Sequence, residues 1–594
     1  METFIANITI INYRSFSQEC QIVLGPLTSL VGYNNAGKSN ILNAIEWLIS
    51  NGSLSEQDFN NCEAPVVVSA EIEGVSECSL GRLGSTHRKK IEKYIRDDKL
   101  VIKRVQAEPG LRATANKWSL LDPETEEWDE NPAGIDAAIK KLFPDAIRIN
   151  AMDDAAADAS KAKTSSTIGK LLKEVSGAVV EKHQGEVDST LGVVRDQLSA
   201  EGIGRFSALN DIDEKMNESV STFFPRVSVK LDIPVPDMEE MFGSGTIKIY
   251  EDNAEIGRPI TYYGHGSQRS IQMALVKLLA DIRASSQDQE NPSTRLLLID
   301  EPELYLHPFA IDILFEAFKS LTHAGYQVVY STHSAQLIDK SIAPSVVLVR
   351  KSPERGTYVR KPLTIAAHEV VNKPEHLQEI IYSLSQATQI FFSETVLVVE
   401  GKTEQRIIPL LYQSLNSKAL AVNHIGVADL SGKELFPKAH RILSSMDIPF
   451  KFVADLDFAF KLAHENDFLD SSDSDYQALL AILKSLEVQQ LIALDDKGHP
   501  KTKKSPCSAE EAYHLLATQP EAHQHVRNIH QKLLEHEIWV WPLGSIENHI
   551  GNDSKDELGL VRYMDQLRSH GVEAICPDPE GTRRFVTWID EPWL

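Results

Sequence analysis

The sequence predicts an α/β protein built in two parts, and two observations support this prediction. Two long stretches of the chain alternate apolar strands with helix-forming segments, one over 1–375 and one over 376–594. At 594 residues the chain also exceeds what one hydrophobic core usually supports. Polar, helix-favouring segments at about 151–235 and about 461–535 interrupt the two stretches, so one helical insertion is expected in each part.

The composition is that of an ordinary globular protein, with 42% hydrophobic and 24% charged residues. Apolar runs long enough to span a bilayer and signal-peptide features are both missing, so we expect a cytoplasmic protein without membrane contact. The five cysteines show no CxxC pair, which argues against a disulfide framework or a structural zinc site. A formal net charge of −25 argues against a broadly basic surface for nucleic acid but leaves local phosphate contacts open.

The first motif is a glycine-rich loop, GYNNAGKS at 32–39, between a predicted strand at 27–31 and a predicted helix at 40–49. It fits G-x-x-x-x-G-K-[ST] in the strand–loop–helix context that phosphate binding requires. Backbone N–H groups of such a loop surround the phosphates, and the helix N-terminus adds partial positive charge. Lys38 is expected to contact the β- and γ-phosphates and Ser39 to ligate Mg²⁺. The residues predicted to hold ATP here are Gly32, Asn35, Gly37, Lys38 and Ser39.

A second nucleotide motif lies at the end of a predicted buried strand, Leu296–Asp300. Asp300 is expected to hold Mg²⁺ and Glu301 to polarise the attacking water. About thirty residues later another predicted strand, Gln327–Tyr330, ends shortly before His333. This order resembles the ABC-type ATPases, and the resemblance implies that His333 senses the γ-phosphate.

Between these motifs, YGHGSQR at 263–269 precedes a predicted helix, Ser270–Arg283. It resembles a degenerate ABC signature motif, with His265 and Ser267 where the family usually has Ser and Gly. Gly266, near a helix N-terminus, would face a phosphate. In ABC enzymes this motif completes the ATP site of the opposite subunit, so the resemblance implies a homodimer or higher oligomer through the ATPase domains.

Two features of this first part have open interpretations. The helical insertion at about 151–235 is either an oligomer contact, and so a dimerisation element, or an exposed hairpin without a special role. Arg14, in NYRSF, resembles the opening motif of chromosome-maintenance ATPases; it is either a nucleotide contact or an ordinary surface arginine. Sustained heptads are missing, which excludes a long-armed coiled-coil protein.

In the second part, acidic residues follow three predicted strands, at 395–399, 450–454 and 538–541. The carboxyl ends of strands in such an open sheet lie at one edge, where ligands gather, so these side chains are expected to converge. So much negative charge without cations would be costly. Oxygen ligands without Cys or His favour two Mg²⁺ or Mn²⁺ ions. The predicted metal ligands and catalytic residues are Glu400, Glu404, Asp455, Asp457 and Glu547, with Ser545 as a further ligand.

The pattern Glu-Gly-x-x-Glu followed by Asp-x-Asp resembles the Toprim fold, in which Gly401 is expected to permit a sharp turn. Toprim domains occur in topoisomerases, primases and nucleases. The cysteines cannot supply a primase zinc module. The tyrosines that could act as nucleophiles lie in no recognisable strand-passage domain: Tyr412, Tyr476, Tyr513 and Tyr563. Hydrolysis of phosphodiester bonds by two metal ions is therefore favoured, with one ion activating water and the other stabilising the leaving oxygen.

Further candidates are not ranked by their spacing. Asp429 either joins the acidic residues or begins a turn. The lysine-rich run at 497–504 either binds phosphate backbone or is a solvated loop. A nearby cation could assist catalysis, and four side chains are candidates: Lys433, Lys555, Arg583 and Arg584.

An ABC-type ATPase followed by a Toprim domain is similar to the overcoming lysogenization defect (OLD) nucleases over essentially the whole chain. The segment LVGYNNAGKSNIL at 30–42 is particularly similar to phage-encoded members of that family. The resemblance implies DNA nicking or degradation, ATP-controlled assembly, and a role in antiphage defence or phage exclusion. It leaves open whether the chain acts alone or with a helicase, a retron or another defence-system subunit.

Two other functions also remain open. One is an ABC-type sensor of DNA ends whose Toprim domain binds nucleic acid without cutting it. The other is a topoisomerase-like strand-transfer enzyme, which would form a covalent protein–DNA adduct. Metal-dependent cleavage that is lost on Asp455→Ala or Glu400→Ala would exclude the first, and absence of the adduct would exclude the second.

Overall fold

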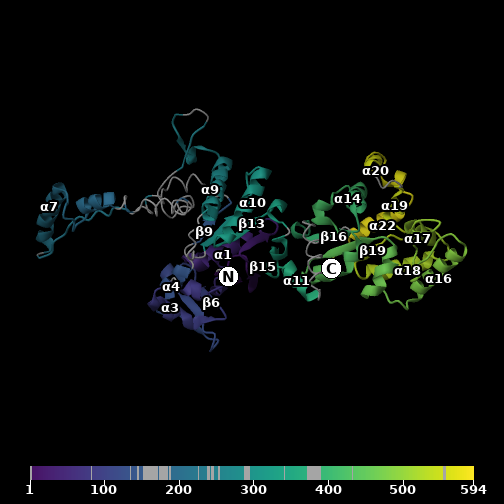
Figure 1. Cartoon of the computed structure of the whole chain (residues 1–594), viewed down its shortest axis with the longest axis horizontal. Helices are drawn as coiled ribbons and strands as arrows, with labels where there is room; N and C mark the ends of the chain where they lie inside the picture. Colours follow the sequence, from purple (N-terminus) through teal and green to yellow (C-terminus); the bar gives the residue numbers. More distant parts are fainter. Residues whose placement is uncertain are drawn as a thin grey trace. The chain divides into compact units, whose positions relative to one another are not determined.

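The computed structural model (Figure 1) describes most of the chain in two compact units. The first unit comprises Met1–Leu30, Gly37–Leu337 and Pro353–Thr357, and the second comprises Val31–Ala36, Ile338–Ser352 and Tyr358–Leu594. The described residues are 3–81, 83–133, 135–142, 146–151, 172, 185, 189–224, 226–236, 241, 247–251, 255–285, 295–339, 341–370, 389–430, 432–552 and 557–593. The predicted boundary at 375/376 lies outside them and stays a prediction.

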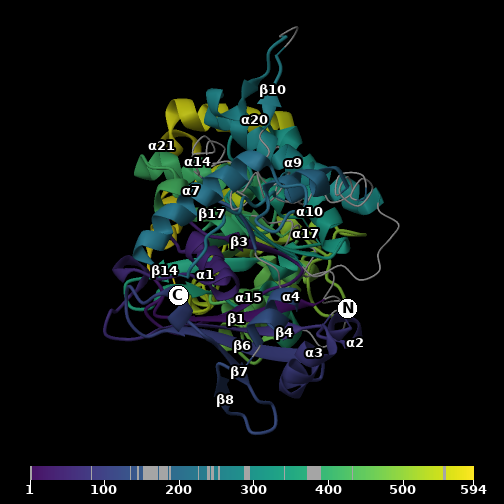
Figure 2. The ribbon, with the colours of Figure 1, turned by 90° about the vertical axis from the view of Figure 1, so that its left-hand side faces the viewer.

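An antiparallel sheet forms one layer of the first unit, in the order β2-β1-β4-β6-β7-β8, with β5 paired to β6. Figure 2 shows several of these strands side by side in purple and blue. The burial of β4 alternates along its length, as expected for a sheet with one covered face. The strands are β1 (Phe4–Ile11), β2 (Cys20–Val23), β4 (Val66–Glu73), β5 (Ile95–Arg96), β6 (Lys99–Gln106), β7 (Trp118–Leu121) and β8 (Trp128–Glu130). Three helices occur in this region: α2 (Glu77–Leu80), α3 (Ser85–Ile91) and α4 (Ile135–Leu142).

A second layer of this unit contains the strands that precede the nucleotide motifs, which are neighbours in the order β3-β13-β12-β9. β12 pairs in parallel with both β13 and β9. β13 is buried at every residue, its polar residues Gln327, Ser331 and Thr332 included, as expected for a parallel strand covered on both faces. The strands are β3 (Leu27–Val31), β9 (Ile147–Ile149), β12 (Arg295–Asp300) and β13 (Tyr326–Thr332), and the helices are α1 (Lys38–Ser50), α9 (His265–Ser285) and α10 (Pro308–His323).

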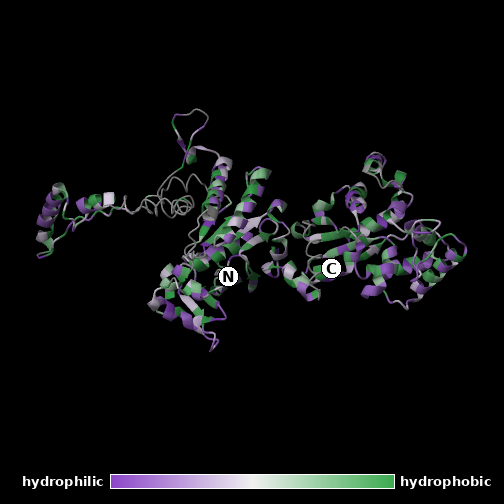
Figure 3. Cartoon of the chain, in the orientation of Figure 1, coloured by the Kyte–Doolittle hydropathy of each residue, from purple (hydrophilic) through white to green (hydrophobic). Residues whose placement is uncertain are grey.

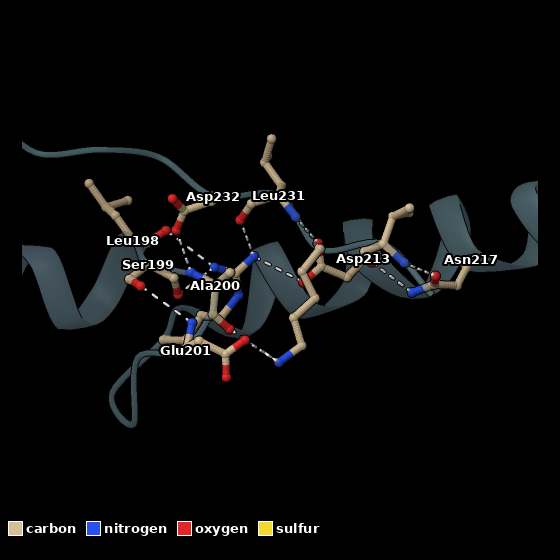
Figure 4. Close-up of polar contacts among 11 residues, drawn as sticks. Leu198, Ser199, Ala200, Glu201, Asp213, Asn217, Leu231 and Asp232 are labelled. Carbon is tan, nitrogen blue, oxygen red and sulfur yellow. Dashed lines mark hydrogen bonds and ion pairs between the residues drawn. The ribbon is translucent and has the colours of Figure 1, made fainter. Parts of the chain in front are cut away.

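The described part of the first predicted helical insertion contains two helices and an extended segment. Residues 189–198 form a helix, and α7 (Ser207–Phe223) follows. The chain then returns in an extended conformation along α7. Figure 4 shows how it is held: Asp213 Oδ1 accepts from the N–H of Leu231 at 2.8 Å, and Asn217 Oδ1 accepts from the N–H of Val229 at 2.7 Å. Residues 152–171 of the predicted insertion lie outside the described residues.

Short elements connect the two halves of the sequence. The strands β10 (Lys248–Ile249) and β11 (Arg258–Pro259) pair as a small antiparallel ribbon before α9. Four elements precede the second sheet along the chain: β14 (Val347–Ser352), β15 (Gly356–Val359), α11 (Leu363–Val370) and α13 (Gln389–Phe392). The predicted helix at 376–389 lies almost wholly outside the described residues.

The second unit is built on a parallel sheet in the order β17-β16-β18-β19. Figure 3 shows these strands mainly in green, because they are apolar. Helix α14 shares a hydrophobic core with β16 and β19, while Phe436 of α15 contacts Phe452 of β18 at a ring distance of 4.7 Å. The strands are β16 (Thr395–Val399), β17 (Ile425–Asp429), β18 (Phe450–Ala454) and β19 (Ile538–Val540).

Helices account for most of the remaining second unit. The predicted helical insertion at about 461–535 contains a π-helical turn, η9 (Ala459–Ala463), followed by three helices. Among the described helices of the whole chain, none combines the length and apolar character needed to cross a membrane. The helices of this unit are α14 (Lys402–Asn416), α15 (Phe436–Ser445), α16 (Ser474–Val488), α17 (Ala509–Ala517), α18 (His523–Leu534), α19 (Ile546–Ile550), α20 (Glu557–His570), α21 (Val572–Ile575) and α22 (Pro579–Asp590).

Candidate functional site

The predicted phosphate loop joins β3 to α1, which begins at Lys38, two residues earlier than predicted. Gly37 has φ 114°, a conformation that side-chain-bearing residues rarely adopt, and an added Cβ would also collide with Thr357. Gly32 is buried, and a Cβ there would meet the carbonyl of Val349. Ser39 is exposed in the first turn of α1. The loop therefore needs glycine at two of its predicted positions.

Lys38 is a buried cation of this site, with 5% of its surface exposed. Its Nζ lies 2.8 Å from Nε2 of His333. Because an ammonium group only donates, Nε2 is the acceptor and the imidazole is neutral. Burial and the charge of Lys38 both lower the pKa of His333, in agreement with that assignment. His333 Nε2 also lies 3.4 Å from Oε1 of Glu301.

Asp300 and Glu301 occur where β12 ends, as predicted. The Ser331 hydroxyl donates to Oδ1 of Asp300, and Nη2 of Arg148 lies 3.4 Å from Oδ2. Glu301 has φ 47°, which is uncommon for a residue other than glycine. Its N–H donates to the carbonyl and the hydroxyl of Ser331, at 3.2 and 3.0 Å, and so fixes this backbone conformation.

The signature-like turn is the first turn of α9, which begins at His265 rather than at Ser270. His265 and Ser267 are exposed, and Gly266 is half-buried. Arg269 is 4% exposed and donates to the carbonyl oxygens of Asp300 at 2.6 Å and Glu301 at 3.0 Å. Arg269 thereby ties this turn to the end of β12, a contact that the sequence pattern did not reveal.

The acidic residues of the second unit follow the carboxyl ends of its parallel strands. Glu400 follows β16, and its Oε2 accepts from the N–H of Asp455, beyond β18, at 3.3 Å. Glu404 is 6% exposed in the first turn of α14. Glu547 lies in the first turn of α19, after β19. Asp429 ends β17, so a fourth strand, not singled out from the sequence, also delivers a carboxylate.

Two of these carboxyl groups have pKa values that are raised by burial and, in addition, by neighbouring acids. Burial raises the pKa of Glu404 to about 8, and the charges of Glu547, Glu400 and Asp429 add to the shift. Burial also raises the pKa of Asp455 well above its usual value, with Glu400 and Glu404 as the main charges. Oδ1 of Asp455 is buried and has no hydrogen-bond partner. The five predicted carboxylates therefore interact with one another, and Asp429 joins them.

Lys433 is the predicted cation that meets the acidic residues. Its Nζ lies 2.6 Å from both carboxylate oxygens of Asp457 and 3.0 Å from Oε1 of Glu400. Burial lowers the pKa of Lys433, but Asp457 and Glu400 raise it above its usual value. Lys461, one turn after Asp457, contacts its Oδ2 at 2.9 Å. Over the described residues, groups of three or more acidic, His or Cys side chains arranged to hold a metal directly are absent.

The loop before α19 is fixed by several hydrogen bonds. Gly544 has φ 110°, and its carbonyl accepts from the N–H of Leu456, within the Asp-x-Asp segment, at 2.8 Å. His549 is 2% exposed; its Nε2 accepts from the N–H of Leu543 at 3.0 Å, and its Nδ1 lies 2.7 Å from Asp578. These contacts connect the segment that carries Glu547 to the segment that carries Asp455 and Asp457.

Comparison with known proteins identifies both halves. Residues 27–339 match the family model "AAA domain, putative AbiEii toxin, Type IV TA system", and residues 391–457 match "Overcoming lysogenization defect protein-like, TOPRIM domain". The chain is 35% identical over 594 residues to the Old nuclease of Escherichia phage P2, covering 99% of this chain and 100% of that protein. The chain belongs to the OLD nuclease family. It is accordingly a metal-dependent nuclease with an ATPase domain.

More distant relatives share parts of the chain. The OLD nuclease of Thermus scotoductus is 28% identical over 170 residues, which are 27% of this chain and 30% of that protein. Endonuclease GajA of Bacillus cereus is 22% identical over 240 residues, which are 36% of this chain and 34% of that protein. The TOPRIM match of this OLD family member ends at Asp457, so Ser545 and Glu547 lie beyond it.

Several predicted roles in this OLD family member need correction or stay open. Gly401 has φ −156°, an extended conformation open to any residue, and an added Cβ would lie 3.5 Å from Glu404, so a sharp turn does not explain this glycine. Ser545 is fully buried, and its hydroxyl lies 3.4 Å from Glu510 of α17, which was not considered from the sequence. Arg583 pairs with Glu573 instead of with an acid of the site. Lys555 lies outside the described residues.

Proposed function

We propose that this OLD nuclease cuts DNA by metal-dependent phosphodiester hydrolysis at the acidic edge of the TOPRIM sheet. Two Mg²⁺ or Mn²⁺ ions are held there by the carboxylates of Glu400, Glu404, Asp455, Asp457 and Glu547. The observation that carries the proposal is the buried Oδ1 of Asp455, which has no hydrogen-bond partner in a cluster of interacting acids.

The donor set fits a hard divalent cation. It consists of carboxylate oxygens, which Mg²⁺ and Mn²⁺ prefer over nitrogen and sulfur. Burial, together with the charges of neighbouring acids, raises the pKa values of Glu404 and Asp455, and a divalent cation would offset both effects. When bound, a pair of such ions lowers the pKa of water and neutralises charge on the phosphodiester. The tight loop at Gly544 and the neutral His549 hold the Glu547 segment in place for this task.

The ATPase domain is proposed to bind Mg-ATP and to control cutting. Lys38 and Ser39 contact the phosphates and their Mg²⁺, Asp300 holds the same ion, and Glu301 polarises the attacking water. The 2.8 Å contact between Lys38 and His333 supports a switch. A bound γ-phosphate would compete for the Lys38 ammonium and release His333, which would donate to a phosphate oxygen once its Nε2 carries a proton.

We also infer that two copies of the chain complete each other's nucleotide sites. The start of α9 supports this proposal, because His265 and Ser267 are exposed there. Gly266, between these two residues, lies next to Tyr305: a Cβ added to this glycine would be 3.5 Å from the tyrosine side chain, which is 59% exposed. ATP with the Glu301→Gln variant should stabilise the dimer in light scattering. An unchanged mass with and without ATP would exclude this arrangement.

The burial of the four candidate tyrosines supports hydrolysis over strand transfer through a tyrosine nucleophile. Tyr412, Tyr476, Tyr513 and Tyr563 are at most 4% exposed. Burial also raises the pKa of each phenol, which disfavours the phenolate that would attack a phosphate. None of the four is therefore poised as a nucleophile.

The test is a cleavage assay on linear, circular, nicked and single-stranded DNA with Mg²⁺ or Mn²⁺, each with and without ATP. Wild type should cut at least one substrate, and a chelator or Glu400→Ala should abolish cutting. RNA serves as the competing substrate. Binding without cutting on every DNA would favour the DNA-end sensor, and a covalent adduct trapped by denaturant would favour strand transfer.

We propose antiphage defence or phage exclusion as the biological role, which loss of protection in cells carrying Glu400→Ala would support.

A further inference from the structure

The acidic edge is electrically divided into two halves. Glu400 and Asp457 contact ammonium groups, from Lys433 for both and from Lys461 for Asp457. The other half consists of Glu404, Asp455 and Glu547, which form no ion pair with any described residue. The cluster therefore contains one compensated and one uncompensated group of carboxylates.

Lys433 lies where a cation would bind the compensated half. Its Nζ bridges carboxylates that follow two neighbouring strands, β16 and β18, at 2.6 to 3.0 Å. All three side chains are largely shielded, with 17% of Lys433, 14% of Asp457 and 19% of Glu400 exposed. An ion that shares oxygens of Glu400 and Asp457 would occupy the volume of this ammonium group.

The position of Lys433 on the chain allows its ammonium group to move away from Glu400 and Asp457. It is the first residue of the short 3-10 turn η8 (Lys433–Leu435), and it follows Gly432, whose φ is 140°. Its four-carbon stem is flexible, and the ammonium is a compact charge that a divalent ion can replace. Lys461 is different, because it contacts one oxygen of Asp457 from the π-helical turn and is 35% exposed.

We infer that Lys433 is a displaceable counter-ion of the metal centre, which holds the Glu400–Asp457 position until a divalent cation takes it. This inference rests on the proposed metal site. The first cation would be held by Glu404, Asp455 and Glu547, where negative charge is uncompensated, and the second would be held by Glu400 and Asp457 once Lys433 withdraws. The withdrawn ammonium is then free to contact a non-bridging oxygen of the phosphodiester. Binding of the second cation is thereby coupled to binding of DNA, because the DNA phosphate is a new partner for the Lys433 ammonium.

The test is a titration of the full-length protein with Mn²⁺, without ATP and DNA, followed by the electron paramagnetic resonance signal of free Mn²⁺. Wild type should bind one ion more tightly than the other. Lys433→Met should strengthen the weaker site by about tenfold or more, because a charged competitor is gone. Lys461→Met, the matched control, should change it by less than about threefold, because that ammonium contacts only one oxygen.

A weaker site that Lys433→Met leaves unchanged or weakens would overturn the inference, and so would an equal gain in Lys461→Met. Lys433→Gln repeats the measurement with a polar side chain, should the methionine variant not fold. Asp455→Ala separates the two levels of the argument. If wild type binds Mn²⁺ and Asp455→Ala does not, the metal site stands and only the role of Lys433 is at issue. If Asp455→Ala binds as wild type does, the proposed site itself is wrong.

Discussion

In the nucleotide site Lys38 and Asp300 contact polar or charged side chains, whereas at the acidic edge Glu404, Asp455 and Glu547 have no cationic partner among the described residues. Lys38 donates to His333, and Asp300 is held by Ser331 and Arg148. At the acidic edge, burial and like charges raise the pKa values of Glu404 and Asp455. The charged groups of the nucleotide site therefore have partners within the protein, whereas three carboxylates of the acidic edge lack a cationic one among the described residues.

The difference follows from what each site receives. ATP arrives with its own Mg²⁺ and a chain of phosphates, so a preformed loop and partners that can be exchanged are sufficient. A bare divalent cation needs several carboxylates close together, and their mutual repulsion is relieved only when it binds. The acidic edge should therefore be the part of the molecule most sensitive to metal and to pH.

The largest effect is expected from Asp455→Ala, which removes the carboxyl group whose Oδ1 is buried without a hydrogen-bond partner. Cleavage should fall by at least about a hundredfold, because losing even an outer partner of a metal ligand costs ten- to a hundredfold. Nucleotide affinity should not change, since the Lys38 site lies in the other unit. Plasmid nicking with Mn²⁺ and binding of a fluorescent ATP analogue measure the two effects. Asp565→Ala, an exposed position on α20, is the control; cleavage retained in Asp455→Ala would contradict the assignment.

Lys38→Ala is expected to have the opposite pattern of effects: it should weaken nucleotide binding and leave metal binding unchanged. Removing one charge-assisted contact to phosphate should weaken ATP binding by about ten- to a hundredfold. Mn²⁺ affinity measured without nucleotide should stay at the wild-type value. Calorimetric titration with ATP and with Mn²⁺ tests both statements on one preparation. If this variant also lost its metal affinity, the two sites would not be independent.

The same contrast explains what the sequence could predict. Strands rich in apolar residues stand out in the sequence, so β3, β16 and β18 were predicted with the bounds that the structure has. Asp300 ends its strand, and Glu400 and Asp455 directly follow theirs, so the backbone alone places these residues. The convergence of Glu400 and Asp455 needs only the rule that parallel strands present their carboxyl ends at one edge.

The partners of these residues could not be predicted, because they come from distant segments with no spacing rule. Arg148, on β9, reaches Asp300, and Arg269 reaches the same strand end from α9. Sequence spacing did not rank Lys433 above Arg583 as the cation beside the acidic residues. In the structure Lys433 contacts Glu400, whereas Arg583 contacts Glu573. The helical start of α9 was placed five residues late, since glycine-rich turns and first helical turns share the same residue types.

A tenfold effect is expected from pH. Burial raises the pKa of Glu404 from its ordinary value of 4.5 to about 8, so the carboxyl is mostly protonated at pH 7 without metal. Because a cation must displace this proton, Mn²⁺ affinity should fall by about tenfold for each pH unit below 8. Glu404→Gln should flatten this dependence.

The stability of the metal-free protein should move in the opposite direction. Between pH 4.5 and 8 the folded state binds more protons at Glu404 than the unfolded chain does, so stability falls as pH rises through this window. Thermal melting in chelator from pH 5 to pH 8.5 measures the trend for wild type and Glu404→Gln. A wild-type melting temperature that rises across the window, with no difference from the variant, would contradict the raised pKa.

The smallest effect is expected from Arg583→Ala, which tests whether any basic residue near the C-terminus supports the acidic edge. Arg583 and its partner Glu573 have side chains that are 59% and 57% exposed. An exposed ion pair contributes less than about 1 kcal/mol, so the melting curve should barely move. Cleavage should stay within about twofold of wild type, since solvent screens a charge that touches none of the acids. A tenfold loss of cleavage would mean that Arg583 leaves Glu573 and contacts DNA, and the contrast between paired and unpaired charge would then extend beyond the two sites.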